Sequence, residues 1–282
     1  MIALLRSRIV SLCAALAAGT AFAAPAAALE EVPFITTPDN VTLEMLRIAN
    51  VGASDHLIDL GSGDGRIVIV AAQRYGASGL GVEIVPDLVR QSEESARKAG
   101  VADRVQFREQ DIFKTDLSGA SVITMYLLPD VNLALRPRLL ALKPGTRIVS
   151  HDWDMGDWKP DQTTVLPVPD KKVGREKSSK VHLWTVPASV QGLWCGAGLL
   201  QGTRFDVKQS FQEFTATMTR GERVREYAGH IEGDTLSSLP GARTHMQLRL
   251  QGEQLVLVQA DGALGLLKGA ALSRAKGEHC AD

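Results

Sequence analysis

The chain has 282 residues, of which 45% are hydrophobic and 22% are charged. These fractions are close to those of average globular proteins, and they exclude a disordered, collagen-like or coiled-coil chain. The 31 basic and 32 acidic residues give a formal charge of −1, whereas a protein that mainly grips nucleic-acid phosphates carries a clear basic excess. We therefore expect no nucleic-acid partner. The three cysteines are too few for a disulfide scaffold.

The first 23 residues have the organisation of a cleavable export signal. Arg6 and Arg8 form a basic segment, an uncharged alanine-rich run follows from 9 to 23, and Ala21-Phe22-Ala23 presents small residues to a signal peptidase. A cut at 26–28 is an alternative. A permanent anchor is another, but this run is short for a span that needs about 20 residues. The prediction is a signal peptide followed by a periplasmic protein with no stable membrane span.

From Asp39 to about Val186, apolar runs alternate with amphipathic stretches, a pattern that indicates βα units and a mostly parallel sheet. The predicted strands are 56–60, 79–83, 104–107, 121–126 and 146–150, with a closing pair at 163–168 and 181–186. The predicted helices are 66–75, 86–99 and 130–142.

From about Gln191 to Asp282 the pattern changes to short alternating stretches separated by glycine- or charge-bearing turns. This is typical of an antiparallel meander that forms a small barrel or a sandwich. With a linker at 187–189, the predicted domains are an α/β domain at 24–186 and a small antiparallel β domain at 191–282. The predicted strands of the second domain are 205–211, 214–219, 224–231, 246–250 and 255–258.

A glycine-rich loop, 59–66 (Asp-Leu-Gly-Ser-Gly-Asp-Gly-Arg), joins the first predicted strand to the first predicted helix. Glycines there permit a tight turn and a close ligand approach, and the helix N-terminus offers free N–H groups. The loop does not match the dinucleotide fingerprint, because the position of its third glycine holds Arg66. It does not match a phosphate-binding P-loop either, since no Lys-Ser/Thr pair follows.

The G-x-G-x-G pattern preceded by Asp59 resembles motif I of the class I S-adenosylmethionine-dependent methyltransferases. Three further elements follow in that family's order: Glu83 ends the second strand, Asp111 lies beyond the third, and Tyr126-Leu-Leu-Pro129 follows the fourth. The resemblance implies a Rossmann-like sheet with helices on both faces, and S-adenosylmethionine as cofactor. It also implies that Glu83 accepts the ribose diol and that Asp111 lies near the adenine amino group. The implied cofactor-binding residues are Asp59, Gly61, Ser62, Gly63, Gly65, Glu83 and Asp111.

Within this superfamily the sequence most resembles the archaeal and mitochondrial protein-lysine methyltransferases. The resemblance covers about 40–186 and rests on four blocks. The implied methyl acceptor is an amine of a protein. The signal peptide and the C-terminal region lie outside the resemblance and leave the substrate open. The four blocks are 59–66, 81–84 (Gly-Val-Glu-Ile), 126–129 and 145–151 (Gly-Thr-Arg-Ile-Val-Ser-His).

Methyl transfer to a lysine requires an aligned, neutral amine. Tyr126 is the first candidate to line the acceptor slot, with a purely structural tyrosine at a strand end as the alternative. Asp152, after the fifth strand, is a candidate proton acceptor, or it caps the loop 153–158. His151 is expected to be structural. The two tryptophans of that loop either wall a substrate groove or cover a core edge.

The basic run 171–180 is expected to be a solvated turn, with a docking surface for acidic proteins or lipid headgroups as the alternative. Cys195 and Cys280 are a predicted disulfide in an oxidising compartment, and two unpaired thiols are the alternative. No metal site is predicted, because the sequence has neither a CxxC motif at these cysteines nor an HxxxH spacing.

The sequence thus predicts an exported S-adenosylmethionine-dependent methyltransferase that acts on a protein amine, with lysine as the expected acceptor. One alternative is a methyltransferase for a small molecule. Another is a periplasmic binding or sensor protein with a silent cofactor fold, because S-adenosylmethionine is made in the cytosol and an exported enzyme needs a supply. The oligomeric state stays open.

Overall fold

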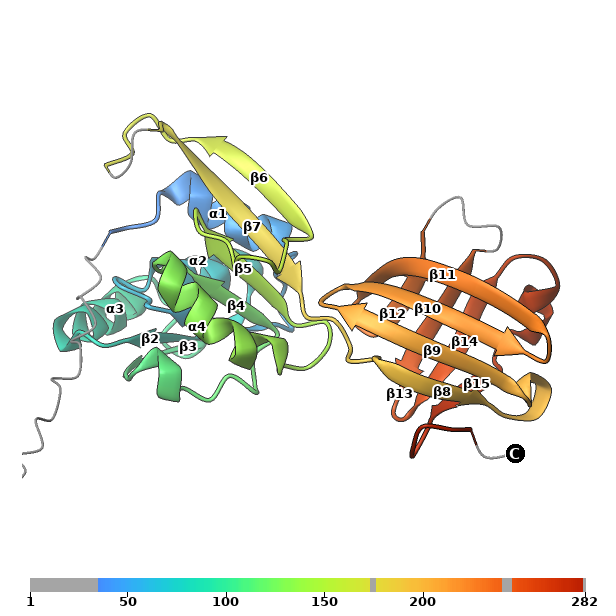
Figure 1. The fold of residues 1–282 in the computed structure, drawn as a ribbon. Coiled ribbons are helices and arrows are strands. Elements are labelled where there is room, and N and C mark those ends of the chain that lie inside the picture. Colours follow the sequence, from blue (N-terminus) through green and yellow to red (C-terminus); the bar gives the residue numbers. More distant parts are fainter. Residues whose placement is uncertain (1–34, 173–175, 240–244, 281–282) are drawn as a thin grey trace, which may run out of the picture. The chain divides into compact units, whose positions relative to one another are not determined.

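A computed structural model describes residues 35–172, 176–239 and 245–280, so the predicted signal peptide lies outside the described residues. The chain first forms a helix-covered sheet and then an all-β barrel (Figure 1). The helices of the first part are α1 (Asp39–Ile48), α2 (Arg66–Tyr75), α3 (Pro86–Lys98), the short 3₁₀ helix η1 (Ile112–Lys114) and α4 (Pro129–Leu140). Its strands are β1 (His56–Leu60), β2 (Ser78–Glu83), β3 (Val105–Glu109), β4 (Val122–Met125), β5 (Arg147–His151), β6 (Gln162–Pro167) and β7 (Ser178–Thr185).

Seven strands form one sheet in the order β3-β2-β1-β4-β5-β7-β6. Strands β1 to β5 run parallel, whereas β7 is antiparallel to both β5 and β6. The chain builds outward from β1 to β3 and then returns to place β4 on the other side of β1. In such sheets ligands bind at the carboxyl ends of the strands, where the order reverses. The fold therefore locates a site beside the ends of β1 and β4.

Helices cover both faces of this sheet, as the sequence predicted (Figure 1). Successive residues of a strand point to opposite faces, and the buried side chains divide accordingly. Leu57 and Val122 pack in one cluster with the apolar stripes of α1, α2 and α3. Their neighbours Ile58 and Ile123 pack in a second cluster with Leu135 and the rest of the apolar face of α4.

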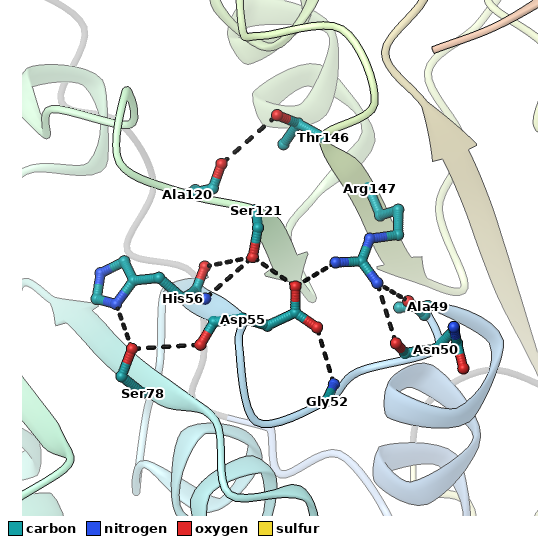
Figure 2. A network of polar contacts seen from close by, with 10 residues as sticks. All are labelled: Ala49, Asn50, Gly52, Asp55, His56, Ser78, Ala120, Ser121, Thr146 and Arg147. Carbon is teal, nitrogen blue, oxygen red and sulfur yellow. Dashed lines mark hydrogen bonds and ion pairs between the residues drawn. The ribbon is translucent and has the colours of Figure 1, made fainter.

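A polar network fixes the amino ends of the strands (Figure 2). The carboxylate of Asp55 accepts hydrogen bonds from the Ser121 hydroxyl at 2.7 Å and from the backbone N–H of Gly52 at 2.8 Å. It also pairs with Arg147, whose guanidinium donates to the carbonyl of Asn50 at 3.0 Å. The network joins the segments before β1, β4 and β5, at the edge of the sheet opposite to the predicted site.

The second part of the chain is a closed antiparallel barrel, one of the two forms that the sequence left open. Inside it, Phe205 and Val207 are buried, while Asp206 and Lys208 between and beside them are exposed. In a small barrel, inward-facing side chains that fill the core alternate with outward-facing ones along every strand. Its strands are β8 (Gly192–Gly196), β9 (Thr203–Ser210), β10 (Glu213–Arg220), β11 (Arg223–Glu232), β12 (Thr235–Ser238), β13 (Met246–Gln251), β14 (Gln254–Ala260) and β15 (Ala271–Arg274), with 3₁₀ helices η2 (Gly198–Leu200) and η3 (Gly262–Leu267).

Cys195 and Cys280 form a disulfide with a Cα–Cα distance of 5.5 Å, which confirms the predicted bridge. It ties the end of the chain to β8 of the barrel. In the described part of the chain, the α-helix and strands that were not predicted from the sequence are α1, β8, β12 and β15, and the three short 3₁₀ helices were not predicted either. Among the helices of the described part of the chain, none combines the length and the apolar character of a membrane span.

Candidate active site

The glycine loop turns the chain from β1 into α2 through three left-handed residues. Gly61, Gly63 and Gly65 have φ angles of +73°, +54° and +77°, a region that side-chain-bearing residues rarely adopt. At Gly65 a Cβ atom would lie 2.6 Å from the ring of Phe107, and at Gly61 it would lie 2.9 Å from Leu127. Backbone conformation and packing both require glycine here.

Glu83 ends β2 directly beside this loop and is only 8% exposed. One of its carboxylate oxygens accepts a hydrogen bond from the Gly63 N–H at 2.9 Å, and the other accepts from Ile84 and Val85 at 2.8 and 3.1 Å. Because a carboxylate offers about four acceptor positions, it retains capacity for a ribose hydroxyl. Ile84 is 62% exposed at the same edge, so an apolar side chain is available there to cover a flat ring.

Asp59 is almost fully buried and accepts a hydrogen bond from the Thr124 hydroxyl at 2.7 Å. Burial raises the pKa of Asp59 to about 7, against the Thr124 hydrogen bond, and the negative charge of Glu83 adds to the increase. A cationic group that binds nearby would favour the ionised carboxylate. The buried hydroxyl of Ser62 has no hydrogen-bond partner among the described residues, which is expected where a ligand supplies one.

These features fit S-adenosylmethionine, which has a ribose diol, an α-ammonium group and an adenine ring. Glu83 would hold the diol, Asp59 and Ser62 would face polar groups, and the glycine loop would admit the close approach. Asp111 lies at the end of β3, where its carboxylate accepts from the Phe113 N–H at 2.8 Å and starts η1. Its assignment to the adenine amino group stays a prediction.

The ends of β4 and β5 bring Tyr126 and Asp152 together. The Tyr126 ring packs on the His151 ring with centroids 3.9 Å apart, and His151 Nε2 lies 3.4 Å from the Asp152 carboxylate. Burial raises the pKa of Tyr126 to about 12, and the charge of Asp152 contributes to that increase. The phenol therefore stays protonated near neutral pH.

His151 is a buried, neutral support for this pair. Its two ring nitrogens lie 3.3 Å from the Thr37 hydroxyl and 3.0 Å from the Ser179 hydroxyl. Burial lowers the pKa of His151 to about 4, so the imidazole carries no charge at neutral pH. Since both nitrogens are engaged by hydroxyls, the ring is fixed in orientation under Tyr126.

Asp152 adopts the left-handed region, with φ of +63°. Its carboxylate accepts from the backbone N–H of Lys180 at 3.0 Å and from the Lys171 ammonium at 2.8 Å. Although burial alone would raise the pKa of Asp152, the Lys171 hydrogen bond and the other contacts lower it. The alternative that Asp152 caps the following loop is wrong, because Asp154 does so by accepting from the Gly156 N–H at 3.0 Å.

A cavity of about 630 Å³ opens at this edge, with Tyr126, His151, Lys171 and Ser179 in its lining. The sequence did not identify Lys171 or Ser179 as site residues. The expectation that the whole basic run is solvated is wrong for Lys171, whose side chain is 14% exposed. The two tryptophans separate: Trp158 is fully buried in the core, and Trp153 is 42% exposed.

Among the described residues, no group of three or more metal-ligating side chains is close enough to hold a metal ion. The groups that the site does present are hydroxyl, carboxylate and ammonium groups. The groups that fit the cofactor lie at one end of the carboxyl edge of the sheet. At the other end a protonated phenol, an ionised carboxylate and a cavity can receive a polar acceptor.

Comparisons with known proteins agree with this geometry. Residues 59–162 match the family model of the ANTKMT methyltransferase domain. A protein-lysine N-methyltransferase of Saccharolobus islandicus is 42% identical over 133 residues, which cover 46% of this chain and 83% of that protein. The adenine nucleotide translocase lysine N-methyltransferase of Mus musculus is 31% identical over 131 residues, which cover 46% of this chain and 57% of that protein.

Among solved structures, one described as an RNA methyltransferase from Salinibacter ruber in complex with S-adenosyl-L-homocysteine is 50% identical, with a TM-score of 0.50. The match covers 55% of this chain and 96% of that chain. The family-model match ends before the barrel begins. The chain therefore belongs to the class I S-adenosylmethionine-dependent methyltransferases, in the lysine methyltransferase group.

Proposed function

We propose that this protein is exported and transfers a methyl group to the side-chain amine of a lysine in a protein acceptor outside the cytoplasm. The observation that carries the proposal is that Tyr126 and His151 line the cavity, with the Asp152 carboxylate 3.4 Å from His151 Nε2. The Tyr126 hydroxyl has lone pairs that can accept a hydrogen bond from an amine N–H. A phenol oxygen of this kind orients the nitrogen lone pair away from itself, toward the cofactor side of the edge.

The reaction places few demands on the protein. When bound, S-adenosylmethionine supplies a methyl group on a positively charged sulfur, so that a carbon–sulfur bond breaks as an amine lone pair forms the new carbon–nitrogen bond. The amine must first lose its extra proton to solvent. The chain's own residues hold the amine in line and exclude competing water, and such alignment supplies a large share of the rate.

Two observations support export. Residues 1–23 have the sequence pattern of a cleavable signal, and the barrel contains the Cys195–Cys280 disulfide, which is typical of oxidising compartments. A reporter fused after residue 40 should reach the periplasm, and the mature chain should begin near Ala24. Recovery of the full-length chain from the cytosol would contradict the proposed localisation.

The proposed domains are the methyltransferase at 24–186 and the barrel at 191–282, with the barrel presenting or docking the acceptor. Val186 packs in a cluster of the sheet, whereas Ala188 and Val190 are buried in the barrel's cluster. The boundary between the two domains therefore lies at Pro187, before these two residues. The fragment 24–186 should bind S-adenosylmethionine with near-native affinity. Loss of binding in a fragment that remains folded by circular dichroism would show that the boundary is wrong.

The acceptor class is tested with the mature chain, methyl-labelled S-adenosylmethionine and a fractionated cell extract. Label that survives ribonuclease and filtration but is lost on proteolysis supports a protein acceptor. Label that ribonuclease removes would identify RNA, which is the activity named for the Salinibacter ruber relative. Label in the filtrate would identify a small molecule. Cofactor binding without any label would indicate a silent fold.

A further inference from the structure

The ammonium of Lys171 is held in the wall of the acceptor cavity. Its Nζ atom lies 2.8 Å from Asp152 Oδ2 and donates to the Ser178 carbonyl at 2.6 Å. The two side chains of the ion pair are 14% and 13% exposed. Holding a lysine side chain this way costs rotamer entropy in addition to desolvation, so the pair needs compensating contacts of the kind that Asp152 and the Ser178 carbonyl provide.

The pair matters because Asp152 lies directly behind the lining of the cavity. Its carboxylate is 2.8 Å from Lys171 Nζ and 3.4 Å from His151 Nε2, and Lys171, His151 and Tyr126 all line the cavity. An unpaired carboxylate in a partly buried site favours the charged form of a nearby amine and raises its pKa by about 1 to 3 units. An ammonium ion has no lone pair, so an unpaired Asp152 would hold the acceptor in its unreactive form.

The other groups around the pair do not replace Lys171 as the neutralising charge. His151 is neutral above about pH 4, because burial lowers its pKa, and Tyr126 is neutral up to about pH 12. Lys180 reaches Asp152 through its backbone N–H, and Lys177 reaches the turn by donating to the Lys171 carbonyl. Among the described residues, the charged or titratable groups around Lys171 are Asp170, Lys172, Glu176 and Lys177 in the turn, Lys180 on β7, His151 and Asp152 at the end of β5, and Tyr126 after β4.

We propose that Lys171 is a positioning residue for methyl transfer: it neutralises Asp152 and so allows the acceptor lysine to enter the cavity as a free amine. The inference rests on the proposed lysine acceptor. Lys171 acts through Asp152 and does not touch the reacting atoms. Lys171 raises the fraction of the bound acceptor amine that is unprotonated. Its effect on the rate is therefore largest at and below neutral pH.

The first test needs no acceptor and measures the pair itself. Aspartate carboxyl carbons are labelled with ¹³C, the Asp152 signal is assigned with Asp152→Asn, and its titration is followed in wild type and in Lys171→Met. Removal of the ammonium should move the Asp152 titration up by at least one pH unit. Lys98→Met removes an exposed lysine of α3 that does not line the cavity and should leave the titration in place. An unchanged titration in Lys171→Met would overturn the proposal.

The second test measures the pH dependence of methylation, with poly-L-lysine as the acceptor probe and saturating S-adenosylmethionine. In Lys171→Met the acidic limb of the rate profile should move up by about one pH unit. The rate at pH 7 should then fall about tenfold, while the rates converge at high pH. The double variant Lys171→Met with Asp152→Asn removes both charges, and its limb should return toward the wild-type position.

Each other result has a definite meaning. A faster Lys171→Met enzyme with an unshifted limb would show that Lys171 only blocks the slot. An equal loss at every pH would show a purely structural role. Both overturn the proposal. If wild type methylates no protein amine, the proposed function fails, and the titration of Asp152 still decides separately whether Lys171 neutralises it.

Discussion

Removal of the Glu83 carboxylate should weaken cofactor binding and destabilise the fold at the same time. In Glu83→Ala the ribose diol loses its acceptor, and charge-assisted hydrogen bonds contribute about 1.5–3 kcal/mol each. Water replaces part of this loss, so affinity should fall about tenfold to hundredfold. The same carboxylate accepts from three backbone N–H groups of the loop and of the segment after β2.

Loss of those three bonds, at about 1 kcal/mol net each, predicts a destabilisation of about 3 kcal/mol. That corresponds to a decrease in Tm of about 10 °C in a chain of this size. Calorimetric titration with S-adenosylmethionine, well below the Tm of the variant, measures the affinity, and scanning calorimetry measures the stability.

Glu109 provides the matched control for this variant. It lies opposite Glu83 in the register of β2 and β3 and is exposed. Glu109→Ala removes the same charge from the neighbouring strand and should change neither the affinity nor the Tm appreciably. Unchanged cofactor affinity in Glu83→Ala would refute the assignment of Glu83 to the diol.

Three further predictions concern the stability of the fold. Gly65→Ala places a Cβ 2.6 Å from a phenylalanine ring at φ of +77°, so it should lower the free energy of unfolding, measured in urea, by more than about 2 kcal/mol. Its control, Gly100→Ala, has a similar φ of +72° but no atom near the new Cβ, and should lower the free energy of unfolding by about 1 kcal/mol. Burial would raise the pKa of Asp55, but the hydrogen bonds and Arg147 of the network in Figure 2 lower it. The wild type should therefore lose stability as the pH falls below about 4 through that pKa, and a pH series of unfolding curves should show a smaller loss in Asp55→Asn. Substitution of Cys195 and Cys280, which are 85 residues apart, by alanine should cost at most about 5 kcal/mol and abolish the effect of dithiothreitol on the melting curve.

Much of the α/β part could be predicted because its determinants are local. The helix at 66–75 and the strand at 56–60 have the predicted bounds, since a glycine turn separates two short apolar segments of different period. Helix α1 was missed because no strand precedes it in the described part of the chain, so the βα pattern gave no reason to expect a helix there. Strands β12 and β15 have only four residues each, which is too short for alternation to be distinguished from chance.

The acceptor side of the site could be predicted only in part. Tyr126 and Asp152 follow strands, so their position at the carboxyl edge was readable from the sequence. The partner of Asp152 was not, because the contact with Lys171 crosses from β5 to the turn between β6 and β7. Within a run of basic residues, the sequence pattern does not indicate which single lysine the fold turns inward.

The most direct measurement of the central claim is the chemical identity of the methylated group. The mature protein is incubated with methyl-labelled S-adenosylmethionine and the acceptor protein fraction, and the labelled product is hydrolysed completely to amino acids and separated. We predict that the label is recovered as ε-N-methylated lysine and that Tyr126→Phe, which removes only the hydroxyl of this cavity-lining residue, reduces its yield. Label recovered in any other amino acid, or in nucleosides, would contradict the account.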